Sequence, residues 1–333
     1  MPTLLTNAKM SPALAARIEA SVAGRRGQPL PTRRITPRLK SLVRVGVVLA
    51  AAAIVTSVVV ARRREHDAFE KDRAALLAAV DKESASLTEK DRHAVERVEA
   101  LVPRLGGAYE GDVVAPEVRS PGAIGALLAR PAMYVRGPLD DFSNAAGVKR
   151  AAGASLKDAL VVCLLDPPAA RTEKALLPKV RAAYGSVATV EQRTPNVRRL
   201  HEAETGMPLL ASPWAARVRA AKEPGELAAL RTELERAPLA RAKEAARAEV
   251  LLVAVDEPAA PGGLTELDGE RAHDVRVALV DLASEKVLLR VRRHVDPGPW
   301  SQSARTDFAS GLDACALAFD VRAVETSARP EAK

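Results

Sequence analysis

The stretch VRVGVVLAAAAIVTSVVVARRR, residues 43–64, limits the possible folds more than any other, because 17 uncharged residues separate Arg44 from Arg62. At about 1.5 Å per residue, a helix of that length covers roughly 26 Å, slightly less than the ~30 Å hydrocarbon core of a membrane. Leu42 and Val43 extend the run, because the long side chain of Arg44 can reach the membrane interface. The run shows no polar face, which a soluble helix usually has. We predict a transmembrane helix over residues 42–61.

A cleaved secretion signal is the main alternative for this run. Such signals span about 15–30 residues in total, whereas 44 residues precede the run here, and the three arginines that follow it are typical of a stop-transfer flank. Basic residues dominate on the N-terminal side: residues 25–44 hold seven and no acid, whereas residues 62–81 hold five of each. This asymmetry predicts an uncleaved signal-anchor in the inner membrane, with the N-terminus cytoplasmic and the rest outside the cytoplasm.

The net charge of +8 also belongs to the tail. Residues 1–44 hold nine Lys or Arg and one acid, and the remaining 41 basic and 41 acidic residues balance. A DNA- or RNA-binding protein would carry its basic surface on the folded domain, so we expect no nucleic-acid partner. Within the tail, residues 1–41, Ser11 and Gly24 can cap a short helix. That helix either lies on the inner leaflet or docks a cytoplasmic partner.

Residues 62–106 are predicted to form a helical stalk. Phe69, Leu76, Val80 and Leu87 recur near helical spacing, which would permit a homo-oligomer through the stalk. Thr88 and Asp91 resemble a capping box that restarts a helix, and Pro103 with Gly106–Gly107 is expected to end it.

Residues 107–325 show the mixed pattern of an α/β or α+β domain, with a mixed sheet covered by helices, and residues 326–333 are expected to be disordered. The segment from Val275 to Val295 alternates about a polar turn, Ala283–Glu285, and predicts a hairpin whose exposed edge could accept a partner strand. Continuous apolar runs predict strands buried on both faces. The predicted strands are 132–135, 159–165, 186–190, 249–255, 275–282 and 286–295; the predicted helices are 121–129, 173–184, 213–221, 226–236, 239–248 and 305–319.

The segment ELDGERAHD is the densest polar cluster in this domain. Asp268, Glu270 and His273 within it could bind a divalent cation, but a solvated loop explains the same residues. Cys163 and Cys315 are the only cysteines, so they form either a disulfide that joins a helix to the sheet or two separate buried thiols. The sequence has no GxGxxG, GxxxxGK[ST], HExxH, GxSxG or CxxC motif, and we assign no catalytic or cofactor-binding residue.

These patterns together predict a single-pass bacterial cell-envelope protein whose outer domain binds a protein or ligand near the membrane. Tethering would raise the local concentration of that domain. One alternative is a signal-transducing regulator that uses its cytoplasmic tail. Another is a membrane-anchored metal-dependent enzyme.

Overall fold

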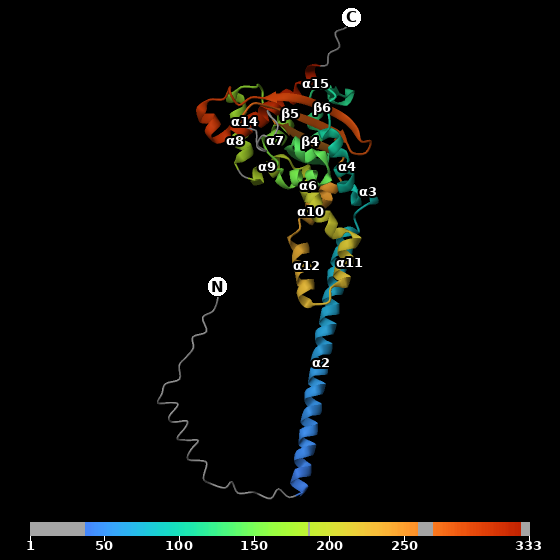
Figure 1. Ribbon diagram of the computed structural model, residues 1–333. Helices are drawn as coiled ribbons and strands as arrows, with labels where there is room; N and C mark the ends of the chain where they lie inside the picture. Colours follow the sequence, from blue (N-terminus) through green and yellow to red (C-terminus); the bar gives the residue numbers. More distant parts are fainter. Residues whose placement is uncertain (1–36, 186, 259–268, 328–333) are drawn as a thin grey trace, which may run out of the picture. The chain divides into compact units, whose positions relative to one another are not determined.

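The computed structural model describes residues 37–185, 187–258 and 269–327, with side chains from residue 47 onward (Figure 1). The predicted tail helix and Asp268 therefore lie outside the described residues. The chain divides into two compact units, Met1–Ala68 and Phe69–Lys333. Helix α2, Pro37–Ser84, crosses their boundary. Within the described residues, no helix is both long enough and apolar enough to cross a membrane.

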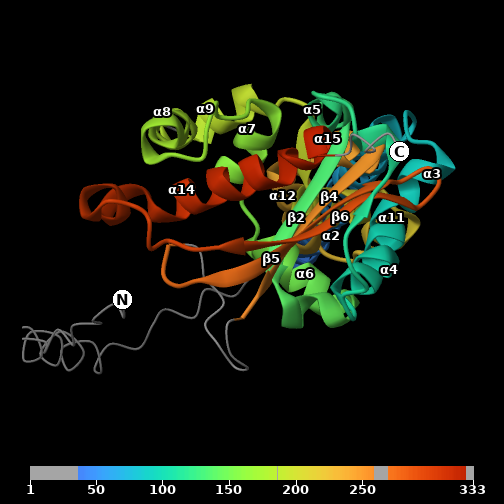
Figure 2. The same cartoon turned by 90° about the horizontal axis from the view of Figure 1, so that it is seen from above.

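A six-stranded mixed sheet forms the centre of the second unit, as far as the described residues show, in the order β1-β6-β5-β4-β2-β3 (Figure 2). Strand β2 runs parallel to both β3 and β4, whereas β4, β5, β6 and β1 pair antiparallel. The predicted hairpin is confirmed as β5 and β6, and the predicted α/β class holds. The strands are β1 Val113–Val114, β2 Ala132–Pro138, β3 Val197–Arg199, β4 Val250–Glu257, β5 His273–Asp281 and β6 Lys286–Val295.

Helices cover both faces of the sheet, because alternate strand residues point to opposite sides and both sets are apolar (Figure 2). One face packs against α5 Ala123–Leu128, α7 Ala159–Leu165, α8 Glu173–Tyr184, α9 Val187–Arg193 and α14 Gln302–Arg322. The other packs against α4 Ala94–Gly106, α6 Ala145–Ala154, α10 Leu200–Gly206 and α13 Leu239–Ala246. The remaining elements are α3 Glu89–Arg92, α11 Ser212–Ala220, α12 Pro224–Arg236, α15 Val324–Ser327 and the 3₁₀ turns η1 Pro116–Val118, η2 Leu139–Ser143 and η3 Met207–Leu210.

The apolar seam predicted for the stalk lies in the core of the second unit. Leu76 and Val80 are almost fully buried in the same cluster as Leu251 and Val253 of the sheet. The side chains of this part of α2 are thus covered within one chain, without a second copy. The capping box of Thr88 and Asp91 is confirmed, but Pro103 lies inside α4, which continues to Gly106.

Two predicted strands are wrong. The run ALVVCLL is helix α7, and residues 186–190 fall largely in helix α9. The Asp158 carboxylate accepts a hydrogen bond from the Leu160 backbone N–H at 2.9 Å and so caps the start of α7. Six of its seven residues are fully or almost fully buried. A short helix buried on every side has no polar stripe, and its sequence cannot be distinguished from that of a buried strand.

Candidate functional site

The carboxyl end of β4 carries two adjacent acids, Asp256 and Glu257, that are 6 and 7% exposed. Because strand side chains alternate, the two carboxylates point to opposite faces of the sheet. The parallel strand β2 ends alongside, with Pro138 opposite Asp256. Ligand sites of open α/β sheets gather at the carboxyl ends of parallel strands, and the side chains around Asp256 and Glu257 therefore form the candidate site.

On one face, Arg136 of β2 joins two carboxylates. Its guanidinium forms two hydrogen bonds to Asp256, at 2.7 and 3.0 Å, and one to Asp158 at 3.0 Å. Its backbone N–H also donates to the Ser155 hydroxyl at 3.0 Å. We refer to Arg136, Asp158, Asp256 and His273 as the Arg136 cluster. It links β2, β4, β5 and the start of α7.

His273 completes the Arg136 cluster from β5, and its side chain is fully buried. Its Nε2 lies 3.7 Å from Asp256, and its Nδ1 lies 3.0 Å from the backbone oxygen of Arg271. Burial by itself would raise the pKa of Asp256, but the charge of Arg136 and the contact with His273 outweigh it and lower that pKa to about 2. Asp256 is therefore a fixed carboxylate, poorly suited to exchange protons near neutral pH.

Of the three predicted metal ligands, the structure describes Glu270 and His273. His273 lies inside the Arg136 cluster, Glu270 is exposed on the turn before β5, and Asp268 lies outside the described part of the chain. Within the described ranges, no group of three or more His, Cys, Asp or Glu residues is placed to hold a metal ion. The metal site stays a prediction from the sequence.

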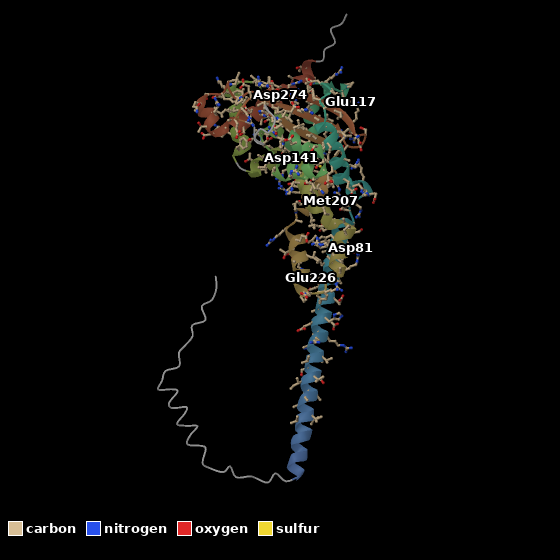
Figure 3. The ribbon with its side chains drawn as sticks, in the orientation of Figure 1. Asp81, Glu117, Asp141, Met207, Glu226 and Asp274 are labelled. Atoms are coloured by element: carbon tan, nitrogen blue, oxygen red, sulfur yellow. A yellow bond between two sulfur atoms is a disulfide. The ribbon has the colours of Figure 1, made fainter. Side chains whose placement is uncertain are left out.

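On the opposite face, Glu257 contacts two arginines, Arg276 of β5 and Arg292 of β6. Arg292 also reaches Asp274 (labelled in Figure 3) at 2.9 Å. Three guanidiniums surround the ring of Tyr109, with distances to the ring centre of 5.4 Å from Arg276, 5.8 Å from Arg290 and 5.9 Å from Arg292. Each is within the range of a cation–π contact.

The Tyr109 hydroxyl donates to the carboxylate of Asp112, just before β1. Burial and the negative charge of Asp112 raise the pKa of Tyr109 to about 12, so the phenol stays protonated at neutral pH. Asp112 in turn accepts from Arg293 at 2.8 Å and from the Arg292 backbone N–H at 3.2 Å. This second group of charges therefore joins the segment before the edge strand β1 to β6.

Comparison with known proteins identifies no family for this chain. No protein-family model matches the chain, and neither the curated proteins nor the solved structures provide a match. In both groups each carboxylate faces at least one guanidinium or imidazole, so these side chains join the strands and loops that carry them.

Cys163 and Cys315 form a disulfide with a Cα–Cα distance of 5.3 Å. Both side chains are fully buried. Because Cys163 lies in α7 and not in a strand, the bond joins α7 to α14 and not a helix to the sheet. Of the two interpretations open from the sequence, the structure has the disulfide.

The first unit carries a surface of a different kind. Eight large apolar side chains of α2, from Val47 to Val60, are between 43 and 66% exposed. Val47, Val48 and Leu49 are consecutive, and at about 100° per residue they alone point over roughly 200° of the helix surface. Thr56 donates its hydroxyl hydrogen to the carbonyl of Ala52 at 2.8 Å, and Ser57 bonds to Ala53 in the same way. This part of α2 is apolar on all sides.

Sequence reasoning missed Arg136 and Tyr109 as centres of charge. Arg136 follows the buried residues Ala132–Val135, and a charge at that place in a strand signals a buried partner. Its partners Asp158 and Asp256 lie 22 and 120 positions away in the sequence, so the signal could indicate an ion pair but not identify it. Tyr109 stands in the segment GGAYEGD, which gives no pattern that predicts three neighbouring arginines.

Proposed function

We propose that the chain is a single-pass membrane protein of the cell envelope, whose second unit is a non-enzymatic binding domain held outside the cytoplasm. The observation that carries this proposal is the all-round exposure of apolar side chains on α2 between Val47 and Val60, which continue an uncharged run that begins at Val45, outside the residues whose side chains the structure describes. A helix that packed on one protein partner would need a single apolar stripe, whereas lipid covers every side equally. The back-bonded hydroxyls of Thr56 and Ser57 suit the same surroundings.

The disulfide supports the placement of the second unit outside the cytoplasm. Disulfides persist in oxidising compartments such as the periplasm and are rare where thioredoxin and glutathione keep thiols reduced. The excess of basic residues before Val45 supports the same orientation, since basic flanks stay on the cytoplasmic side. Two independent features of the chain thus agree on one topology.

A binding role is favoured over catalysis by the state of the charged groups at the carboxyl end of β4. Asp256 is held ionised by Arg136, and Glu257 is contacted by Arg276 and Arg292. These acids stabilise the sheet and are poorly placed to act as general acids or bases. Strand β6 offers a surface for a partner beyond Arg292, because the edge strand β1 pairs only with Leu289 and Arg290 of its ten residues and Asp112 takes the Arg292 backbone N–H.

Membrane fractionation tests the anchor. The wild-type protein should remain in the membrane pellet after alkaline carbonate extraction, and the variant Ile54→Arg/Val58→Arg should be released, because each arginine at mid-membrane depth costs about 3 kcal/mol. The control Ala78→Arg/Ala79→Arg places the same charges at exposed positions of α2 in the second unit and should stay in the pellet. Release of the wild-type protein by carbonate would refute the anchor.

A reporter fusion tests the orientation separately. A reporter that is active only in the cytoplasm, fused after Lys333, should give no signal, whereas one that is active only in the periplasm should give a strong one. The reverse pattern would place the second unit in the cytoplasm and would remove the argument from the disulfide.

A further inference from the structure

The second unit contains an open cavity of about 570 Å³ between α10 and the junction of α12 with α13. Its wall combines residues from α10 and η3 with residues 233–241. Met207 of η3 is labelled in Figure 3 and shows where this part of the unit lies. The volume falls in the range of small-molecule sites, roughly 300–1,000 Å³. The cavity belongs to neither charge group at the carboxyl end of β4.

Three arginines line this cavity: Arg199 at the start of α10, Arg236 at the end of α12 and Arg241 in α13. The side chains of Arg199 and Arg241 are 24 and 46% exposed, so both can be reached from solvent. Arg236 is exposed, and among the residues that the structure describes its side chain has no hydrogen-bond or ion-pair partner. Its guanidinium retains its full set of donors for a ligand.

Two acids also line the cavity, and each accepts hydrogen bonds from an arginine. Glu202 is almost fully buried: its Oε1 accepts from the Arg241 guanidinium at 3.1 Å and its Oε2 accepts from the Arg199 backbone N–H at 3.2 Å. Glu233 receives two hydrogen bonds from Arg217 of α11, at 3.0 and 3.3 Å. Glu202 therefore orients Arg241, which also lies 3.6 Å from Glu191. Three arginines against two acids line the cavity, and Arg236 supplies the guanidinium that neither acid contacts.

Apolar groups supply another part of the wall. Leu209 is largely buried, and Ala237 and Pro238 form the turn between α12 and α13. A ligand that fits this wall needs an anionic head for the guanidiniums and a short apolar body for these side chains. Paired contacts of a planar guanidinium with a carboxylate are among the strongest hydrogen bonds that proteins form.

We propose that this cavity binds a small organic anion, with a carboxylate head on Arg236 and Arg241 and an aliphatic body against Leu209 and Pro238. The proposal does not depend on the membrane anchor. It gives the second unit a small-molecule site.

Calorimetric titration of the full-length protein in lipid nanodiscs tests the proposal, with hexanoate as the probe. Hexanoate should bind saturably, and hexan-1-ol and inorganic phosphate should each bind at least about tenfold more weakly, since each lacks one half of the ligand. The variant Arg236→Gln should weaken hexanoate at least about tenfold. The control Arg219→Gln removes an exposed arginine of α11 outside the cavity and should leave binding unchanged.

Three results would overturn the site as described. Equal binding of hexan-1-ol and hexanoate would remove the role of the charge, and equal binding of phosphate would remove the role of the apolar wall. Wild-type affinity in Arg236→Gln, with its melting temperature unchanged, would show that hexanoate binds elsewhere.

Discussion

The guanidinium of Arg136 and the carboxylate of Asp256 form a paired hydrogen bond across the parallel strands β2 and β4, with distances of 3.0 and 2.7 Å. Both side chains are about nine-tenths buried. Two charges removed from water in this way depend on each other, because either one left alone would keep its desolvation cost and lose its partner. The pair thus makes the end of the sheet sensitive to single substitutions.

Replacing Arg136 by methionine should destabilise the protein by about 3–5 kcal/mol, because Asp256 and Asp158 would lose their shared cation while remaining buried. Urea unfolding followed by circular dichroism measures this loss. Arg130→Met is a matched control, since Arg130 pairs with Glu249 at the surface, where an ion pair contributes at most about 1 kcal/mol. Equal losses in the two variants would contradict the assignment.

Acid should remove the contribution of Asp256 to the free energy of unfolding. Its folded pKa of about 2 lies below the ordinary value of 3.8, so its stabilisation is present above pH 3.8 and is lost as the pH falls toward 2. Wild-type stability should therefore decline over this range more steeply than that of Asp256→Asn, as measured by urea unfolding at each pH. Parallel curves for the two proteins would show that Asp256 keeps its ordinary pKa in the fold.

Glu204 of α10 should give the opposite pH dependence. Burial, together with the negative charge of Glu99, raises its pKa from 4.5 to about 7, and Lys149 only partly offsets this. The protonated Glu204 side chain contributes fully to the free energy of unfolding below pH 4.5. This contribution is lost as the pH rises through 7, because the folded state then holds a buried, unfavourable carboxylate. Glu204→Gln should flatten the fall of the melting temperature between pH 5 and 8, whereas the exposed control Glu235→Gln should not.

The sequence predicted the parts of the fold that repeat in a regular pattern. The alternation of Val275–Val295 identified the hairpin, and helix 173–184 matches α8. It failed at ALVVCLL, because burial on every side removes the difference between the patterns of helix and strand. The contacts Arg136–Asp256 and Tyr109–Arg276 join residues more than a hundred positions apart, and no local pattern encodes such pairs.

Removing the disulfide by Cys163→Ala/Cys315→Ala should cost about 2–4 kcal/mol. The bond closes a segment in which the cysteines are 152 residues apart, and the entropy of so long a loop sets an upper value of about 5 kcal/mol. Unfolding by urea without reductant measures the difference. Titration of two free thiols in the denatured, unreduced wild-type protein would contradict the disulfide itself.

Gly147 should tolerate no side chain, because a Cβ placed there would lie 2.2 Å from the backbone oxygen of Asp141. The start of α6 cannot move away to make room, since the Asn144 side chain caps the Gly147 N–H at 3.0 Å. Gly147→Ala should therefore lower the free energy of unfolding by about 1–3 kcal/mol, the usual cost of overpacking.

Gly225, in the first turn of α12, is a matched control, because no atom beyond its chain neighbours and its own helix backbone lies within 4 Å of a Cβ placed there. Gly225→Ala should be neutral or stabilising by up to about 1 kcal/mol, and an equal loss in both variants would show that space at Gly147 is not the cause.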